Sequence, residues 1–298
     1  MINFSKSLRR FMQYMSQGFT SSSEIGQGIT VSESNSEYCQ PMPQTLQECL
    51  DTGASLLKGG DVSHAIKLFQ QAVTIDPGYV AAHNILGRAY LRNGQTNEAM
   101  ACFLRSIELN PKHFRAYYDL GCFYKQQGQL EQAIQYLGKA ASLQPDNFHP
   151  YHELGDAFLK KDSFDDSINA FQKAIDLNSD FMPSFSGLGR AYMKAKKFEE
   201  AVVTYTRLSE LNPDSAVVYD NLGRASLNIG RLDAATDAFK KALELNPSSF
   251  LAYDGLARVQ MRKGLLEEAI KSISHAVDIK PEHAPAQELL QKLLVQRG

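Results

Sequence analysis

The sequence predicts an all-α fold made of stacked helix pairs. Three residue types recur along most of the chain at a spacing of 34 residues, and each marks one place in a helix–turn–helix repeat. Glycine recurs at positions 53, 87, 121, 155, 189 and 223, with Ala257 in the last place. Alanine recurs at 65, 99, 133, 201, 235 and 269, and proline at 77, 111, 145, 213, 247 and 281. A fixed period of this length indicates one elongated repeat array rather than separate globular domains.

One repeat, residues 80–113, shows what each position is expected to do. Apolar residues spaced three and four apart predict two short amphipathic helices, and Asn93-Gly94 predicts a left-handed turn between them. Gly87 is expected where the two helices cross, because a side chain there would hold the backbones apart. Aromatic residues such as Phe103 are expected to fill the wider space between successive repeats. The proline that follows stops the second helix.

The chain therefore divides into three parts. Residues 1–43 are expected to form a flexible N-terminal arm, residues 44–283 seven repeats, and residues 284–298 a capping helix. The arm after residue 19 is rich in Ser, Glu, Gln and Gly, a composition that buries too little apolar surface to offset the entropy of ordering. The cap is expected to cover the last repeat with four leucines, Leu289, Leu290, Leu293 and Leu294.

Segment 2–19 has an apolar face and a basic face at helical spacing. Three interpretations stay open. As a basic amphipathic helix it would dock on an anionic membrane surface or in a partner's groove. Having no acid before Glu24 and many serines, it also fits a transit peptide. The third interpretation is a disordered tail.

Composition narrows the functional class. The chain has 31 basic and 33 acidic residues, so it has no excess of positive charge that would attract nucleic acid. We therefore expect no nucleic-acid partner. The four cysteines make no CxxC pair, which indicates a reducing compartment and a cytoplasmic location. No run of 18 apolar residues is present, so no membrane span is expected.

The repeated pattern resembles that of the tetratricopeptide repeat family, in which aromatic-x2-Leu-Gly-x2-Tyr is followed by Ala-x3-Phe and then by proline. In the fourth repeat it reads Tyr151, Leu154, Gly155 and Phe158, followed by Ser167, Phe171 and Ala174. The resemblance covers residues 44–283. It implies a right-handed superhelical solenoid of seven helix-turn-helix repeats.

The resemblance also implies that the first helix of each repeat lines a concave groove in which partners bind. Carried over position by position, it gives these partner-binding candidates: Asn84, Arg88, Arg92, Arg115, Tyr118, Lys125, His152, Lys160, Arg190, Lys194, Arg224, Asn228, Arg258 and Arg262. Basic residues outnumber acids in this set, which favours an acidic peptide or an acidic tail as ligand.

Neighbouring acids weaken that inference. Four pairs at i,i+4 spacing are expected to neutralise one another: Arg115 with Asp119, Asp156 with Lys160, Asp220 with Arg224, and Asp254 with Arg258. The cations left over are Arg88, Arg92, Arg190, Lys194 and Arg262. A mixed-charge groove of ordinary specificity therefore stays an alternative to a groove for acidic ligands. The carboxylate clamp that some family members use for chaperone tails is not reproduced, since Ser186 and Arg190 stand where Lys and Asn are expected.

No catalytic or cofactor motif emerges. The best metal candidate is a group on one helical face, His149, His152, Glu153 and Asp156, which we interpret as polar residues of a solvated inner helix. We therefore expect no enzyme activity, no metal and no cofactor.

The sequence thus predicts a non-enzymatic protein–protein interaction scaffold that binds partner peptides or tails in its groove and self-associates end to end. The alternative is a peripheral membrane-associated assembly factor, of the kind that coats organelles or helps secretion or pilus assembly. It would dock through segment 2–19.

Overall fold

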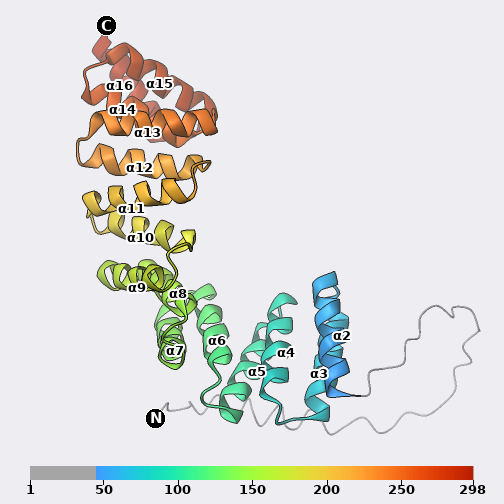
Figure 1. The fold of residues 1–298 in the computed structure, drawn as a ribbon. Helices are drawn as coiled ribbons and strands as arrows, with labels where there is room; N and C mark the ends of the chain where they lie inside the picture. The colour runs from blue at the N-terminus through green and yellow to red at the C-terminus, as the bar shows by residue number, and fades with distance from the viewer. Residues whose placement is uncertain (1–44, 298) are drawn as a thin grey trace, which may run out of the picture. The chain divides into compact units, whose positions relative to one another are not determined.

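The structure is a computed structural model that describes residues 45–297 (Figure 1). The predicted N-terminal arm, with its segment 2–19, lies outside these residues. The chain divides into two compact units, described by themselves: unit 1 up to Ala116 and unit 2 from Tyr117 onward. Residues 45–297 contain fifteen helices and no strand.

Unit 1 consists of two helix pairs and the beginning of a third. Thr45 caps its first helix through a capping box with Glu48. The helices are α2 (Leu46–Gly59), α3 (Val62–Ile75), α4 (Val80–Arg92), α5 (Thr96–Leu109) and the first residues of α6 (Phe114–Gln126). α2 packs against α3, α3 against α4, and α4 against α5.

Unit 2 continues the same alternation. Its helices after α6 are α7 (Leu130–Leu143), α8 (Phe148–Lys160), α9 (Phe164–Leu177), α10 (Met182–Lys194), α11 (Phe198–Leu211), α12 (Ala216–Asn228), α13 (Leu232–Leu245), α14 (Phe250–Arg262), α15 (Leu266–Ile279) and α16 (Ala284–Arg297). We call the even-numbered helices α2 to α14 the first helices of the repeats, and the helix after each one its second helix. Within residues 45–297 we find no helix with the length and apolar character that crossing a bilayer requires.

In each first helix from α2 to α12, a glycine lies directly on a large side chain of the second helix, and in α14 this position is Ala257. A Cβ atom added to Gly87 would lie 2.7 Å from the Phe103 ring, and one added to Gly155 would lie 2.7 Å from the Phe171 ring. The Phe171 ring also meets Gly187 on the next first helix, α10. The expectations for the crossing glycine and for the aromatic between repeats are therefore confirmed. No residue with a side chain fits at these glycines unless the ring moves.

The turns inside the repeats all use a left-handed residue, and these residues recur every 34 positions. Their φ angles lie between 59° and 89° at Gly60, Gly94, Gly128, Asp162, Lys196, Gly230 and Gly264. Two of the seven are therefore residues with a Cβ atom, for which this conformation costs about 1–2 kcal/mol. The absence of glycine in the fourth repeat does not change the turn.

We predict that Lys196→Gly raises the free energy of unfolding by about 0.5–1 kcal/mol. The strain at a φ of 59° disappears, and the greater freedom of glycine in the unfolded chain offsets part of the gain. Thermal and urea unfolding measure the change. The control is Ala195→Gly, one residue earlier at a φ of −71°, which should lower stability. A Lys196→Gly protein no more stable than the wild type would contradict the assigned strain.

Tyr205 takes the place of the phenylalanine in the fifth repeat, and its hydroxyl is buried without a hydrogen-bond partner among residues 45–297. The side chain is 1% exposed, and burial raises its pKa to about 12. A buried hydroxyl without a partner costs about 1–3 kcal/mol of desolvation free energy. By contrast, the hydroxyl of Tyr90 accepts a hydrogen bond from Gln70 Nε2 at 2.8 Å.

Tyr205→Phe should therefore raise the free energy of unfolding by about 1 kcal/mol, since it removes the polar atom and keeps the ring. Tyr90→Phe, which removes a hydroxyl that is bonded, should lower stability by up to about 1 kcal/mol. Chemical denaturation of the two variants side by side makes the comparison. Equal effects in the two proteins would show that the Tyr205 hydroxyl has a partner in solution.

α16 closes the C-terminal end of unit 2. Ala286 and Leu293 are fully buried, in one cluster with Ile270 and Ile273 of α15. Leu294 was expected on the covered side, but it is 45% exposed. Successive helical residues lie about 100° apart, so with Leu293 at the centre of the contact its neighbour turns away from α15.

Candidate functional site

The first helices of unit 2 lie alongside one another and present one surface, which we call the first-helix face: α6 from Tyr117, α8, α10, α12 and α14. α8 contacts α10 and α12 contacts α14 directly. α10 and α12 contribute to one apolar core through residues such as Leu188 and Val218. All candidates from Tyr118 onward lie on these five helices, whereas Asn84, Arg88, Arg92 and Arg115 belong to unit 1.

In unit 1, Arg88, Arg92 and Arg115 are exposed. Arg92 donates a hydrogen bond from Nη1 to the carbonyl oxygen of Leu57, at the end of α2, at 3.3 Å. Asn84 is only 4% exposed. Its side chain is therefore buried in the structure and not presented on an accessible surface as expected.

A network of four charged side chains joins three first helices of unit 2. Lys125 of α6 forms ion pairs with Glu153 and, at 3.4 Å, with Asp156 of α8, and Arg190 of α10 pairs with Asp156 at 3.1 Å. Burial lowers the pKa of Lys125, but the hydrogen bond that Lys125 donates to Glu153 and the charges of both carboxylates outweigh burial and raise this pKa above its ordinary value. Lys125 was expected to be available to a partner, yet its side chain is 13% exposed and is held inside the protein by two carboxylates.

The network also changes the pairing expected of Asp156. Its i,i+4 neighbour Lys160 was expected to neutralise it, but the cations that reach it come from α6 and α10. Lys160 is therefore exposed and forms no ion pair with any residue in 45–297; the same holds for Lys194, one repeat later. Arg190 was expected to be unpaired and is not.

Aromatic side chains and histidines gather beside this network. His152 lies 3.1 Å from Ser184 Oγ through Nδ1, and its ring contacts that of Phe181; burial lowers its pKa. The Tyr118 hydroxyl donates to Glu153 at 3.5 Å. His149 stacks on Phe148 with ring centroids 4.0 Å apart.

This geometry does not make a metal site. In the part of the chain that the structure describes, no three histidine, cysteine or carboxylate side chains are placed to hold a metal ion. His152 and Glu153 are bonded to Ser184 and Lys125 instead. Burial raises the pKa of both Cys102 and Cys122 to about 12, so these two thiols stay protonated near neutral pH and are poor nucleophiles.

The remaining candidates lie on α10, α12 and α14. Arg258 forms a two-bond ion pair with Asp254, at 2.7 and 3.0 Å, as its i,i+4 spacing predicted. Arg224 instead bonds Asn221 at 3.4 Å. Arg262 Nη1 donates to the carbonyl oxygen of Leu227, the bond that Arg92 makes in unit 1. Asn228 is exposed, and its amide bonds the carbonyl oxygen of Arg224.

Asp220, which was expected to pair with Arg224, is buried and 4% exposed. Its Oδ2 accepts a hydrogen bond from Ser249 Oγ at 2.9 Å, and its Oδ1 has no partner in the described part of the chain. Burial raises the pKa of this carboxyl, and the Ser249 bond and the charge of Arg224 counter only part of that effect. Because this carboxylate is buried while Arg224 is exposed, the surface here is more positive than the sequence suggests.

Sequence reasoning missed a second feature of this surface. Pro183, Val217 and Leu251 are exposed at the second position of α10, α12 and α14, and Val217 is 65% and Leu251 47% exposed. Their spacing of 34 residues was the signal that could have identified them.

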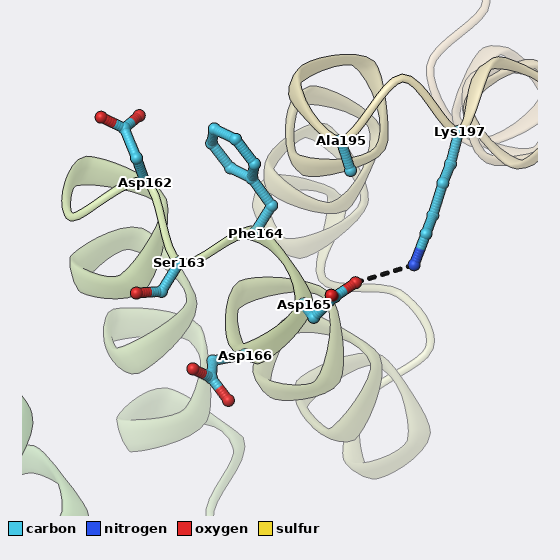
Figure 2. Close-up of a pocket in the computed structure, with 7 residues that line it drawn as sticks. All are labelled: Asp162, Ser163, Phe164, Asp165, Asp166, Ala195 and Lys197. Carbon is cyan, nitrogen blue, oxygen red and sulfur yellow. Dashed lines mark hydrogen bonds and ion pairs between the residues drawn. The ribbon is translucent and has the colours of Figure 1, made fainter.

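A pocket lies elsewhere, at the turns of the fourth and fifth repeats (Figure 2). Its lining residues are Asp162, Ser163, Phe164, Asp165, Asp166, Ala195 and Lys197. Figure 2 shows Lys197 reaching Asp165, at 2.8 Å, while Asp162 and Asp166 point in other directions. The pocket is open and its acids do not converge, so we assign it no chemistry.

Models of the tetratricopeptide repeat match most of the chain, at residues 80–113, 102–135, 123–162, 152–216 and 230–293. A comparison with curated proteins gave no match. Among solved structures, the C-terminal part of a TPR repeat-containing protein from Cytophaga hutchinsonii is 18% identical, with a TM-score of 0.68 over 81% of this chain and 99% of that chain. A tetratricopeptide repeat protein from Parabacteroides merdae is 15% identical, with a TM-score of 0.58 over 85% and 100%.

A third similar structure is YrrB, described as a TPR protein with an unusual peptide-binding site. It is 24% identical, with a TM-score of 0.57 over 62% of this chain and 96% of that chain. At these identities the likeness establishes the fold.

The buried carboxylate gives a pH-dependent prediction. The pKa of Asp220 in the folded protein is above its ordinary value of 3.8. Ionisation of this carboxyl therefore lowers the free energy of unfolding at any pH above the folded pKa. The loss of stability disappears below about pH 3.8, where the carboxyl is protonated in the folded and the unfolded chain. Asp220→Asn should raise the free energy of unfolding by about 1–2 kcal/mol at neutral pH, and the gain should shrink towards zero as the pH falls to 4. Urea unfolding over that pH range measures it.

Asp254→Asn is the matched control, 34 residues later. It removes a carboxylate that is paired with Arg258, so it should not stabilise the protein at any pH. A stability gain of Asp220→Asn that does not change with pH would contradict the assignment.

Proposed function

The chain belongs to the tetratricopeptide repeat family, and from this premise we propose that it is a non-enzymatic scaffold that binds an acidic segment or tail of a partner protein on the first-helix face of unit 2. A stack of helices on which side chains of one face recur from repeat to repeat offers an extended surface for an extended ligand.

The observation that carries this proposal is the imbalance of charge on three successive first helices. α10, α12 and α14 carry five cations, Arg190, Lys194, Arg224, Arg258 and Arg262, against two carboxylates, Asp220 and Asp254. One of these carboxylates is buried and the other is bound to Arg258. Since the whole chain has 31 basic and 33 acidic residues, the positive charge is local to this face.

The availability of these cations supports an anionic ligand. Lys160 and Lys194 form no ion pair in the part of the chain that the structure describes, and the carboxylate nearest to Arg224 in sequence, that of Asp220, is buried. An arginine that a ligand carboxylate reaches forms two parallel hydrogen bonds, which adds geometric selectivity to the charge. The peptide-binding site named in the description of YrrB is consistent with this use of the fold.

Affinity capture with three baits tests the proposal. The first bait is the wild type; the second carries Lys160→Glu, Lys194→Glu and Arg224→Glu on the first-helix face. The third carries Lys139→Glu, Lys173→Glu and Lys240→Glu on the second helices α7, α9 and α13, so its net charge equals that of the second bait. All six side chains are exposed, and circular dichroism confirms that each bait is folded.

We expect a partner with an acidic segment to be retained by the wild type and the second-helix variant and lost by the first-helix variant. Its binding should weaken as salt rises, because exposed charges are screened over about 8–10 Å at ordinary ionic strength. Partners lost equally from both variants would reflect net charge alone, and partners retained by all three would exclude this face as the binding site.

A further inference from the structure

The exposed apolar residues of the first-helix face form a row. Pro183, Val217 and Leu251 are each the second residue of their helix, and all three are exposed. Val217 and Leu251, at 65% and 47%, are among the large apolar side chains most exposed to solvent in residues 45–297. Apolar residues that recur in register on one surface mark an interaction site more strongly than scattered ones do.

A row of arginines runs parallel to the apolar row. Arg190, Arg224 and Arg258 each follow an apolar-row residue by seven positions in the same helix. Residues seven apart lie on the same stripe of a helix, about 10 Å apart along its axis. The face of α10, α12 and α14 therefore carries an apolar row near the helix N-termini and a basic row about two turns later.

The rows do not extend to the preceding repeat. The position of Pro183 is taken there by His149, and that of Arg190 by Asp156, which belongs to the charged network of α6, α8 and α10. Towards the C-terminus the register continues on the capping helix α16, where the exposed residues Pro285 and Lys292 take the two positions, so the combination of apolar and basic side chains begins at α10 and excludes α8.

The spacing of the helices selects the ligand conformation. Packed helices lie about 8–10 Å apart. A polyproline II segment rises about 3.1 Å per residue with three residues per turn, so every third residue faces the same way and recurs about every 9 Å. A segment of this kind that crosses the helices places one residue of each triplet opposite the apolar row and another opposite the basic row.

We propose that the face of α10, α12 and α14 binds an extended segment of about nine residues in which an apolar and an acidic side chain recur every third position. The apolar side chains contact Pro183, Val217 and Leu251, and the carboxylates bind Arg190, Arg224 and Arg258. This inference rests on the proposed function and specifies its ligand. A second copy of the same face does not fit, because both surfaces would be positive.

Fluorescence anisotropy with labelled synthetic peptides tests it on the full chain. The first probe has four Pro-Leu-Glu triplets; the second, with four Pro-Ser-Glu triplets, keeps the charge and removes the apolar side chain. The third, with four Pro-Leu-Lys triplets, reverses the charge. On the protein side, Val217→Ser with Leu251→Ser removes the apolar row without adding charge. Val203→Ser is the control, since Val203 is 71% exposed but lies on the second helix α11.

We expect Pro-Leu-Glu to bind about tenfold more tightly than Pro-Ser-Glu to the wild type, because the leucines are only partly buried on an open surface and together contribute about as much as one fully buried apolar side chain. The double serine variant should lose that difference, binding Pro-Leu-Glu about tenfold more weakly and Pro-Ser-Glu unchanged within twofold. Val203→Ser should bind both peptides as the wild type does, and Pro-Leu-Lys should not bind.

Equal affinity of the wild type for Pro-Leu-Glu and Pro-Ser-Glu would overturn the inference and leave the proposed acidic-segment function standing. An equal loss of both peptides in the double variant would overturn it as well, since the effect would then be structural. If neither acidic peptide binds, the inference fails, and the capture experiment with charge-matched baits decides separately whether the proposed function fails too.

Discussion

The contact between a bare glycine backbone and a ring sets the geometry on which the rest of the structure depends. At Gly155 the first helix of the fourth repeat lies directly on Phe171, and Gly187 brings the next first helix onto the same ring. One side chain thus fixes the distance between two helices of one repeat and the approach of the following repeat. Because the glycine recurs every 34 residues, a side chain at a given place in one first helix has its counterpart at the same place in the next. Rows of similar residues across the face, apolar or basic, follow from this constraint.

The period of the sequence was sufficient to predict the helix pairs, the crossing glycines and the left-handed turns. Those features depend on contacts within a repeat or on the local conformation of one residue. The turn at Asp162 is instructive, because it keeps the left-handed conformation without glycine. The flanking helices impose the turn, and glycine only lowers its cost. Local propensity is therefore a weaker guide there than position in the period.

The ion pairs and hydrogen bonds of the first-helix face could be predicted only in part, because many of its charged side chains bond residues of an adjacent repeat. The i,i+4 rule gave Asp254 and Arg258 correctly. It failed for Asp156, whose partners Lys125 and Arg190 are 31 and 34 residues away. It could not show that Arg262 bonds a carbonyl oxygen 35 residues earlier in the chain. These distances correspond to about one repeat. A rule confined to one helix omits the contacts between adjacent first helices, which decide which cations remain available.

Asp220 and Asp254 occupy the same position one repeat apart, and the difference between them shows how one residue in a neighbouring helix controls the charge of the face. Ser249, at the start of α14, donates its hydroxyl to Asp220 and holds that carboxylate below the surface. The corresponding residue before α16 is His283, whose Nδ1 accepts from the backbone of that helix. Asp254 receives no such hydroxyl and binds Arg258 instead.

Because Ser249 holds the carboxylate of Asp220, this carboxylate does not pair with Arg224, the middle arginine of the basic row. The arginines on either side, Arg190 and Arg258, each form an ion pair with an acidic residue. Within residues 45–297, a ligand carboxylate at Arg224 competes with no ion pair, so its binding there costs less than binding at Arg190 or Arg258.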